Sequence, residues 1–402
     1  MEKRRSFAFL TIMVLLMLTT CAKQSQYPAD DTYHFATDFQ YTWCHQGMDR
    51  EFAESEDGYY FQAIVNNRTY LIYIDKQTMQ AIPLCGKPNC LHYEETDEER
   101  IQLCNALLND YGAMFYSDGT LYAVTSSEEA QEHKALYAFA KDGSSRKELF
   151  KIPQAFSDCL AVHRGNLYVG LNTYSEEVSN QVSILSYDLN HPAKEPETIY
   201  QQDFTDATHI MDIICYGNHL YFHIIEASAS EPFYEVNLQS HKVQEVFPYG
   251  DKEGEYYHYK TVIWNNQLIT EETRFYDAGR GEREGAVLLA DLDGGNVKRG
   301  MNIWAGPYTA DERYLYRWTM FSGGGPLSDQ PTFQVYDQNE KLVAQLDLTK
   351  ELTDYRKFYV SPGEHIFVLG RSKLYYFTKT EIASGSISPK LLWEHDNMYM
   401  RY

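Results

Sequence analysis

Three cysteines and a histidine lie close together in one short stretch of the chain, LCGKPNCLHYEETDEERIQLCNA, as Cys85, Cys90, His92 and Cys104. Thiolates and a neutral imidazole are ligands that structural zinc takes in tetrahedral geometry. Two of the cysteines could instead form a disulfide that pins the loop, with the third free or paired with Cys44. Free thiols are a further alternative. Catalytic redox chemistry is disfavoured because the sequence contains no Cys-x-x-Cys pair.

The spacing of these residues leaves zinc and disulfide open. Four residues separate Cys85 from Cys90 and eleven separate His92 from Cys104, which is not a common zinc-finger spacing. A disulfide that closes a loop of about 15–20 residues would stabilise the fold by roughly 3 kcal/mol in the chain-entropy model. The choice depends on whether the compartment is oxidising, and therefore on where the chain resides.

The N-terminal residues have the pattern of an export signal. Lys3, Arg4 and Arg5 precede a largely apolar run, Phe7 to Leu18, whose twelve residues are too few to span a bilayer as a helix. The following Leu-Thr-Thr-Cys segment, which ends at Cys21, resembles the lipobox of bacterial lipoproteins. The resemblance implies cleavage before Cys21 and acylation of its thiol and its new amino group.

The expected lipid anchor predicts the cellular location of the chain. Residues 1–20 are interpreted as a lipoprotein signal peptide, and residues 21–40 as the lipidated cysteine with a flexible tether. We expect a protein of the cell envelope, lipid-anchored on the outer side of the cytoplasmic membrane or on the periplasmic face of the outer membrane. Disulfides persist in such compartments, which bears directly on the cysteines.

Composition narrows the class of partner. The net charge is −22, and removal of a signal with three basic residues and one acidic residue would take it to −24. This acidity argues against nucleic acid as a partner and against a polybasic grip on anionic lipid. The chain contains 34 tyrosines and 20 phenylalanines, which favours strands over helices.

A repeated kernel predicts the architecture. Each kernel is a turn followed by a short apolar-aromatic strand, and its Leu or Ile recurs at intervals of 46, 53, 48, 47 and 51 residues from Leu121 to Ile366. Asp-Gly, Gly-Asn and Asn-Asn turns are typical of hairpins. A second strand, a tyrosine-rich third strand and a short outer strand follow, and four strands in 40–50 residues are typical of a propeller blade.

We therefore predict an all-β protein, a β-propeller of four-stranded blades over residues 41–402. Seven blades are favoured, with six or eight as alternatives, and an inter-blade loop at residues 83–106 carries the cysteines and the histidine. Residues near His34 to Cys44 could supply a strand that closes the ring. Stacked β-sandwiches are the competing architecture, but they would not share one kernel.

Two hairpins carry a family resemblance. The segments ADLDGGNVKR at residues 290–299 and AKDGSSRKEL at residues 140–149 resemble inter-strand hairpins of TolB-like propellers. The resemblance implies an extracytoplasmic propeller that binds proteins or peptides, usually without catalysis. The Cys-x4-Cys-x-His stretch also resembles an insertion in exported propeller lipoproteins of anaerobic gut bacteria, which would imply reduced thiols.

These observations lead to three functional hypotheses, of which the third is a metal-stabilised sensor or scaffold of the cell envelope. The first is a lipid-anchored extracytoplasmic propeller that binds a protein, peptide or glycan, with structural zinc as the cofactor that the sequence suggests at Cys85, Cys90, His92 and Cys104. The second is a propeller enzyme, a glycan lyase or hydrolase with its site at the mouth of the central channel. No linear catalytic motif occurs, which weakly disfavours the enzyme. Cys159 and Cys215 are expected to be small buried hydrophobic residues.

Overall fold

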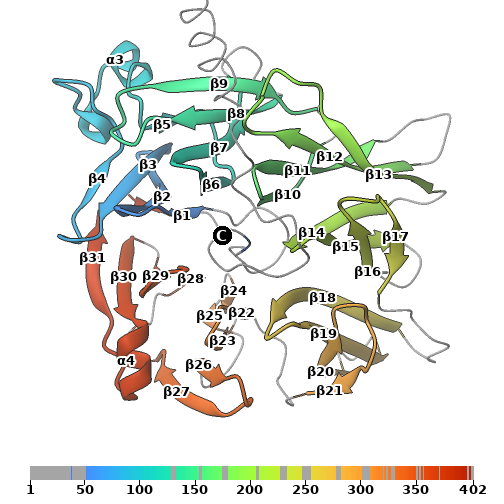
Figure 1. Ribbon diagram of the computed structural model, residues 1–402. Coiled ribbons are helices and arrows are strands. Elements are labelled where there is room, and N and C mark those ends of the chain that lie inside the picture. The colour runs from blue at the N-terminus through green and yellow to red at the C-terminus, as the bar shows by residue number, and fades with distance from the viewer. Residues whose placement is uncertain are drawn as a thin grey trace, which may run out of the picture.

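The computed structural model describes residues 38, 51–127, 133–153, 156–173, 180–204, 208–226, 233–246, 255–277, 282–300, 308–319, 321–322, 325–326, 331–349, 352, 355, 357–370, 372–395 and 398–399. Seven four-stranded antiparallel blades surround a central axis (Figure 1). The predicted all-β propeller and its favoured blade number are therefore confirmed.

Each blade is built from strands that follow one another in the sequence. The first blade contains β1 (Phe52–Glu54), β2 (Gly58–Val65), β3 (Arg68–Asp75) and β4 (Ala81–Pro83), with β5 (Leu107–Leu108) and β32 (Met398–Tyr399) added to it. The second contains β6 (Met114–Ser117), β7 (Thr120–Ser126), β8 (Lys134–Phe139) and β9 (Arg146–Lys151). The third contains β10 (Phe156–His163), β11 (Asn166–Thr173), β12 (Asn180–Asp188) and β13 (Glu197–Phe204).

The remaining blades repeat this order. The fourth contains β14 (Thr208–Tyr216), β15 (His219–Glu226), β16 (Phe233–Asn237) and β17 (Val243–Glu245). The fifth contains β18 (Glu255–Trp264), β19 (Gln267–Asp277), β20 (Glu282–Asp291) and β21 (Lys298–Arg299). The sixth contains β22 (Tyr308–Ala310), β23 (Tyr314–Trp318), β26 (Thr332–Asp337) and β27 (Leu342–Asp347), with the hairpin β24 (Phe321–Ser322) and β25 (Gly325–Pro326) inserted. The seventh contains β28 (Lys357–Val360), β29 (His365–Leu369), β30 (Lys373–Thr378) and β31 (Lys390–Glu394).

The described helices are short and lie outside the sheets. They are η1 (His92–Glu94), α3 (Glu98–Gln102) and α4 (Lys379–Ser384). Helix α4 starts with a capping box between Thr378 and Glu381 and ends at Gly385 in the left-handed conformation. In the part of the chain that the structure describes, no helix has the length and apolar character needed to cross a membrane.

The kernel turns connect the first and second strands of their blades, so the kernel strand is the second strand of its blade, whereas the expected order places it first. Asp118 and Gly119 adopt φ values of 50° and 77°, and Asn265 and Asn266 adopt 52° and 58°. Positive φ at both central positions matches the right-handed twist of the flanking strands. Turn chemistry therefore sets where these two inner hairpins reverse.

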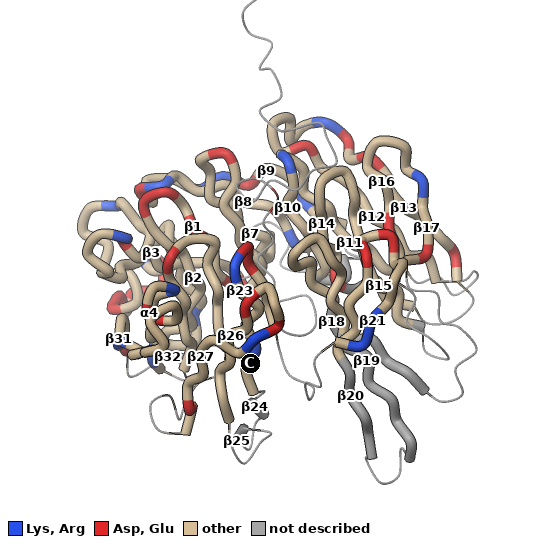
Figure 2. Tube along the Cα trace, turned by 60° about the horizontal axis from the view of Figure 1, so that its bottom comes forward, with Lys and Arg blue, Asp and Glu red and all other residues tan. Residues whose placement is uncertain are grey.

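Apolar side chains fill the spaces between neighbouring blades. The largest buried cluster joins the first, second and seventh blades and includes Phe61, Leu71, Leu121 and Phe367. Burying a side chain of this size contributes about 1.5–3 kcal/mol. Figure 2 shows acidic and basic residues gathered mainly at turns and strand ends, whereas the strands themselves are mainly uncharged. Blade packing, rather than a separate core, thus holds the ring together.

A strand near His34 to Cys44 that closes the ring stays a prediction, because this segment lies outside the described residues except for Asp38, which belongs to no described strand. Strand β32 pairs with β2 of the first blade, through Ile64 with Tyr399 and Val65 with Met398. Residues 398–399 therefore contact the first blade.

Candidate metal centre

The cysteine- and histidine-containing segment interrupts a strand. Both β4 and β5 pair with β3, the former through Ile72 with Pro83 and the latter through Tyr70 with Leu107. Between them Leu71 accepts from Leu84 N–H at 2.8 Å and donates to the Ala106 carbonyl at 2.8 Å. Residues 85–105 are thus an insertion within the outer strand of the first blade, which resumes in register. The predicted inter-blade loop at residues 83–106 takes this more specific form, since the second blade begins only at β6.

Local structure positions the four predicted ligands. Cys85 follows directly after the first half of the strand, and Cys104 precedes the second half. Cys90 ends a turn in which its N–H donates to the Lys87 carbonyl at 3.4 Å. His92 starts η1 with a φ of 54°, a conformation uncommon for non-glycine residues that redirects the chain toward the cysteines.

The four side chains converge. The ligand atoms of Cys85, Cys90, His92 and Cys104 all lie within 4.8 Å of one another, and Cys104 Sγ lies 3.6 Å from His92 Nδ1. Tetrahedral zinc with bonds of about 2.3 Å to sulfur and about 2.0–2.1 Å to nitrogen requires a sulfur–nitrogen separation of about 3.6 Å. The arrangement is compatible with a structural zinc ion.

The protonation chemistry of the cluster suits a cation. Burial opposes ionisation of Cys85, but backbone N–H groups of Lys87 and Asn105 face its sulfur, and the net effect lowers the pKa of that thiol. Burial, followed by the nearby Cys85 sulfur, raises the pKa of Cys104 to about 12. Burial lowers the pKa of His92, which favours the neutral imidazole that binds metal. A divalent ion would offset both the burial and the repulsion from the Cys85 sulfur that raise the pKa of Cys104.

The insertion rests on the second blade. The Gly143 carbonyl accepts from Gly86 N–H at 3.0 Å and from Asn105 Nδ2 at 2.8 Å. Gly143 has a φ of 66°, and a Cβ at this position would lie 2.6 Å from the Cys85 nitrogen. Only glycine therefore allows the β8–β9 hairpin to approach the first ligand so closely. This hairpin is one of the two that resemble TolB-like turns.

The other cysteines take simpler roles. Cys85, Cys90, Cys104, Cys159 and Cys215, which are the cysteines among the described residues, are all free thiols. Cys159 and Cys215 are each 1% exposed, which confirms the prediction that they are small buried residues. Ile213 N–H also donates to Cys159 Sγ at 3.3 Å. Neither the predicted lipidation site, Cys21, nor Cys44 is among the described residues.

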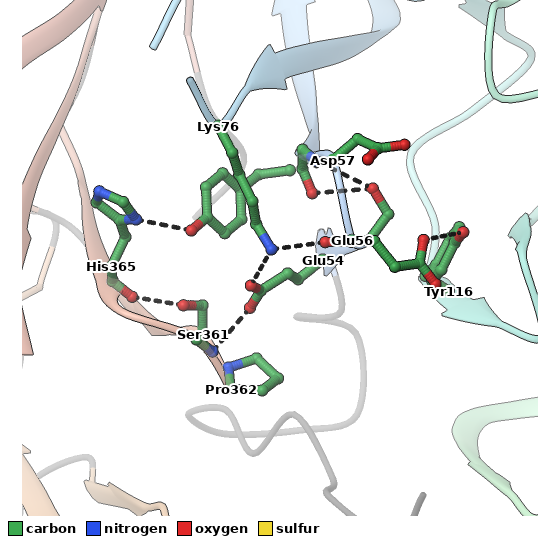
Figure 3. A network of polar contacts seen from close by, with 12 residues as sticks. Glu54, Glu56, Asp57, Lys76, Tyr116, Ser361, Pro362 and His365 are labelled. Atoms are coloured by element: carbon green, nitrogen blue, oxygen red, sulfur yellow. Dashed lines mark hydrogen bonds and ion pairs between the residues drawn. The ribbon is translucent and has the colours of Figure 1, made fainter. Parts of the chain in front are cut away.

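A second polar cluster, which the sequence did not reveal, lies where the first and seventh blades meet (Figure 3). Tyr59 Oη lies 2.7 Å from His365 Nδ1, and Glu54 accepts from Gly363 N–H at 3.0 Å. Lys76 Nζ lies 2.5 Å from the other oxygen of Glu54. We call this group of contacts the seam. No linear motif signals it, because about 300 residues separate Tyr59 from His365 and Glu54 from Gly363.

The seam continues toward the blade cores. Lys357 Nζ lies 3.0 Å from Glu51 Oε1, with both side chains almost fully buried, and the Tyr359 hydroxyl donates to the other oxygen of Glu51. The Phe52 ring lies 4.9 Å from the Phe367 ring and 5.6 Å from the Tyr359 ring, measured between centroids. Burial lowers the pKa of His365 at the outer part of this interface.

Further buried ion pairs link other parts of the ring. Arg164 Nη2 lies 2.8 Å from Asp38 Oδ2, and Asp38 is fully buried although it falls within the predicted tether. Lys379 Nζ lies 2.6 Å from Asp311 Oδ2, which joins the seventh blade to the sixth. The Tyr316 hydroxyl donates to the same carboxylate at 2.6 Å. These carboxylates thus have structural partners.

Comparison with known proteins gives likeness in fold. No protein-family model matches the chain, and no curated protein is similar to it in sequence. A prolyl endopeptidase structure has a TM-score of 0.57 at 10% identity, over 89% of this chain and 50% of that one. This chain therefore spans about half the length of that enzyme.

Two further structures are similar to the chain. The β-propeller domain of the trilobed protease from Pyrococcus furiosus has a TM-score of 0.50 at 9% identity, over 90% of this chain and 98% of that one. TolB from Acinetobacter baumannii is also among the similar structures, at a TM-score of 0.39 and 10% identity, over 70% of this chain and 61% of that one. At such identities the likeness concerns the propeller fold alone.

Proposed function

We propose that the protein is a lipid-anchored propeller of the cell envelope that binds a protein, peptide or glycan. The export pattern before Cys21 and its lipobox-like segment support the anchor. The closed propeller supports the binding module, because it presents loops from several blades on one rigid ring.

The pairing of buried charges carries the preference for binding over catalysis. Glu51 pairs with Lys357, Asp38 with Arg164, and Asp311 with Lys379, and each pair joins separate parts of the ring. A general acid or base must exchange a proton with substrate, whereas these groups are held by a structural partner. Within the described chain they serve as links of a rigid frame.

Zinc at the insertion completes the proposal. Cys85, Cys90, His92 and Cys104 would hold the ion in a closed tetrahedral shell without an open position for substrate. The ion would fix both ends of the insertion next to the interrupted strand. Its role is therefore structural. The ion would raise the free energy of unfolding by an amount that depends on its free concentration and on its affinity for the folded chain.

Metal analysis tests the zinc part directly. Full-length protein purified without oxygen is expected to contain one zinc ion per chain. After denaturation in the presence of a chelator, Cys85, Cys90 and Cys104 should all be counted as free thiols. Absence of zinc together with two fewer free thiols than expected would establish the disulfide alternative.

Two further measurements test anchoring and binding. Radiolabelled palmitate should be incorporated into the wild-type protein in cells and not into a Cys21→Ser variant. Full-length protein in detergent should retain ligands from peptide and glycan arrays, and mass spectrometry should recover those ligands intact. Cleavage of a retained glycan or peptide would replace the binding proposal with the enzyme hypothesis.

A further inference from the structure

An aspartate from the N-terminal part of the chain is buried on the propeller. Asp38 is 0% exposed, and its carboxylate accepts from two nitrogens of one guanidinium, Oδ1 from Arg164 Nε at 3.0 Å and Oδ2 from Arg164 Nη2 at 2.8 Å. A bidentate pair of this kind is one of the stronger polar contacts in proteins. Asp38 is therefore held by a residue that lies 126 positions further along the chain.

Arg164 occupies a turn position that suits other residues better. It lies in the kernel turn between β10 and β11 with a φ of 46°, and Asp118 and Asn265 take φ values of 50° and 52° in the corresponding turns. Short Asp and Asn side chains tolerate the left-handed conformation better than a long side chain does. The backbone thus gives no reason for an arginine at this position, whereas the contact with Asp38 does.

The fourth blade supports the same arginine. Arg164 Nη1 donates to Asn218 Oδ1 at 3.3 Å, and Asn218 lies in the kernel turn between β14 and β15. The side chain of His163 is 1% exposed and donates from Nε2 to the Gly217 carbonyl at 2.7 Å, while its Nδ1 lies 3.7 Å from Asp38 Oδ1. Two kernel turns therefore hold the guanidinium in place between them. We call His163, Arg164, Gly217 and Asn218 the dock.

The dock lies on a different part of the ring from the strand that the N-terminal segment enters. Figure 1 shows β1 to the left of the centre and β10 and β14 to its right. Glu51, which directly precedes β1, pairs with Lys357 at the seam. Both ends of the segment from residue 38 to residue 51 are therefore fixed by ion pairs between buried side chains, at two different junctions of the ring.

The contact at the dock limits the free length of the predicted tether. There are 17 residue steps from Cys21 to Asp38, and a fully extended chain of that length spans at most about 61 Å. Without this contact, the next residue held by an ion pair is Glu51, 30 steps from Cys21, with a span of at most about 108 Å. The dock would therefore nearly halve the distance at which an anchored ring can stand from its membrane.

We propose that the dock fastens the N-terminal segment to the propeller, so that the lipid-anchored ring is attached to the membrane through the junction of its third and fourth blades. Residues 22–37 then form the whole free tether. The inference rests on the proposed lipid anchor and names the surface that receives the anchored segment. Breaking the ion pair between Asp38 and Arg164 should release this segment and lengthen the tether.

Limited proteolysis of the lipidated full-length protein in liposomes tests the dock. Chymotrypsin cleaves after aromatic residues, which flank Asp38 on both sides as Phe35 and Phe39. Mass spectrometry identifies the first residue of the released ring, which should still contain Asp38 in the wild type, because cleavage requires the local chain to open. Arg164→Asn and Asp38→Ala should each raise the rate of cleavage after Phe39 by about tenfold, since each removes a charge-assisted pair. Asparagine keeps the positive φ of the turn accessible, as at Asn265.

A matched variant controls for the loss of an arginine. Arg313 is exposed in the kernel turn of the sixth blade, so Arg313→Asn should be cleaved like the wild type. Two dock variants are used because misfolding of one, seen as cleavage throughout the ring, leaves the other as the test. Equal rates of cleavage after Phe39 in the wild type and in a folded dock variant would overturn the proposal.

Energy transfer measures the length of the tether separately. A fluorophore on a non-natural amino acid at position 193, where Ala193 is exposed in the third blade, would be paired with an acceptor dye on the lipid. Transfer should be more efficient in the wild type than in Arg164→Asn, because the third blade is then no longer the point of attachment. Equal transfer in the two lipidated proteins would overturn the shortened tether. If Cys21 carries no acyl chain, the proposed anchor fails, while the cleavage pattern still decides whether the dock holds Asp38.

Discussion

The first blade meets its two neighbours by different means. Toward the second blade it extends the insertion, which rests on Gly143 and places four potential metal ligands within 4.8 Å of one another. Toward the seventh blade it uses the seam, in which Glu51 faces Lys357 and Tyr59 faces His365. The first junction is local in sequence, whereas the second joins residues about 300 positions apart.

This difference indicates which contacts contribute to local stability and which contribute to the stability of the whole ring. Contacts that are local in sequence can form early and open independently of the rest. Contacts across the seam exist only when the whole ring has closed, so their loss should be felt in global unfolding. Changes at the two junctions should therefore be separable by experiment.

Removal of the proposed zinc ion should have the largest effect, confined to the insertion. Cys104→Ser should abolish zinc binding and with it an apparent binding free energy on the order of 10 kcal/mol, as in structural zinc peptides. Amides of residues 85–105 should then exchange rapidly, while strands of the other blades stay protected. Metal content and hydrogen exchange measure this together. Cys159→Ala, which removes a buried thiol far from the cluster in sequence, should keep its zinc, and full retention of zinc by Cys104→Ser would refute the site.

Breaking the buried seam pair should come next and should act globally. Lys357→Met leaves the Glu51 carboxylate buried without its ammonium partner, so the free energy of unfolding should fall by about 3–5 kcal/mol. Urea denaturation measures the loss. Adding Glu51→Gln to this variant should restore part of it, because the uncompensated charge disappears. A single-variant loss below about 1 kcal/mol would contradict the assigned role of the pair.

Gly143→Ala should have an intermediate effect at the insertion. A Cβ would lie 2.6 Å from the Cys85 nitrogen, and the positive φ of Gly143 adds strain. Gly119→Ala provides the comparison, because Gly119 also has positive φ but has no neighbouring atom within 4 Å of its ideal Cβ. Thermal unfolding should show Gly143→Ala to be less stable than Gly119→Ala by about 1–3 kcal/mol, the cost of overpacking. Equal losses would show that backbone strain alone matters.

The pH dependence of the seam should be the smallest effect. Burial lowers the pKa of His365 below its usual 6.5, so the unfolded chain takes up a proton more readily than the folded one. The contribution of this group is fully present above about pH 6.5 and is lost as pH falls through its folded pKa. Melting temperatures measured from pH 8 to pH 5 should fall less steeply for His365→Gln than for the wild type. Parallel profiles would exclude the histidine as the cause.

The repeat could be predicted because its information is local. Two residues such as Asp118-Gly119 or Asn265-Asn266 are enough to predict a hairpin turn with positive φ. Six such kernels at a near-constant interval were enough to predict four-stranded blades. The sequence also grouped the cysteines and the histidine, whose ligand atoms lie within 4.8 Å of one another, because residue type and proximity along the chain are both visible in sequence.

The remaining features depend on contacts that no short segment contains. Glu51 and Lys357 are ordinary charged residues until ring closure brings them to 3.0 Å. Strand β5 has only two residues, so its continuation of β4 could not be read as a strand pattern. The close approach of Gly143 to Cys85 likewise needs the packed blades. Sequence thus predicted elements and ligand types, and packing determined their neighbours.

The outer strand of the first blade stops at Leu84 and resumes at Ala106, and both residues form backbone hydrogen bonds with Leu71 of β3. This interruption has a consequence for engineering. Since the sheet continues across the gap, the intervening residues form a cassette that the scaffold tolerates at a fixed point on its rim. A reporter peptide grafted there would be displayed between two strands that both pair with β3.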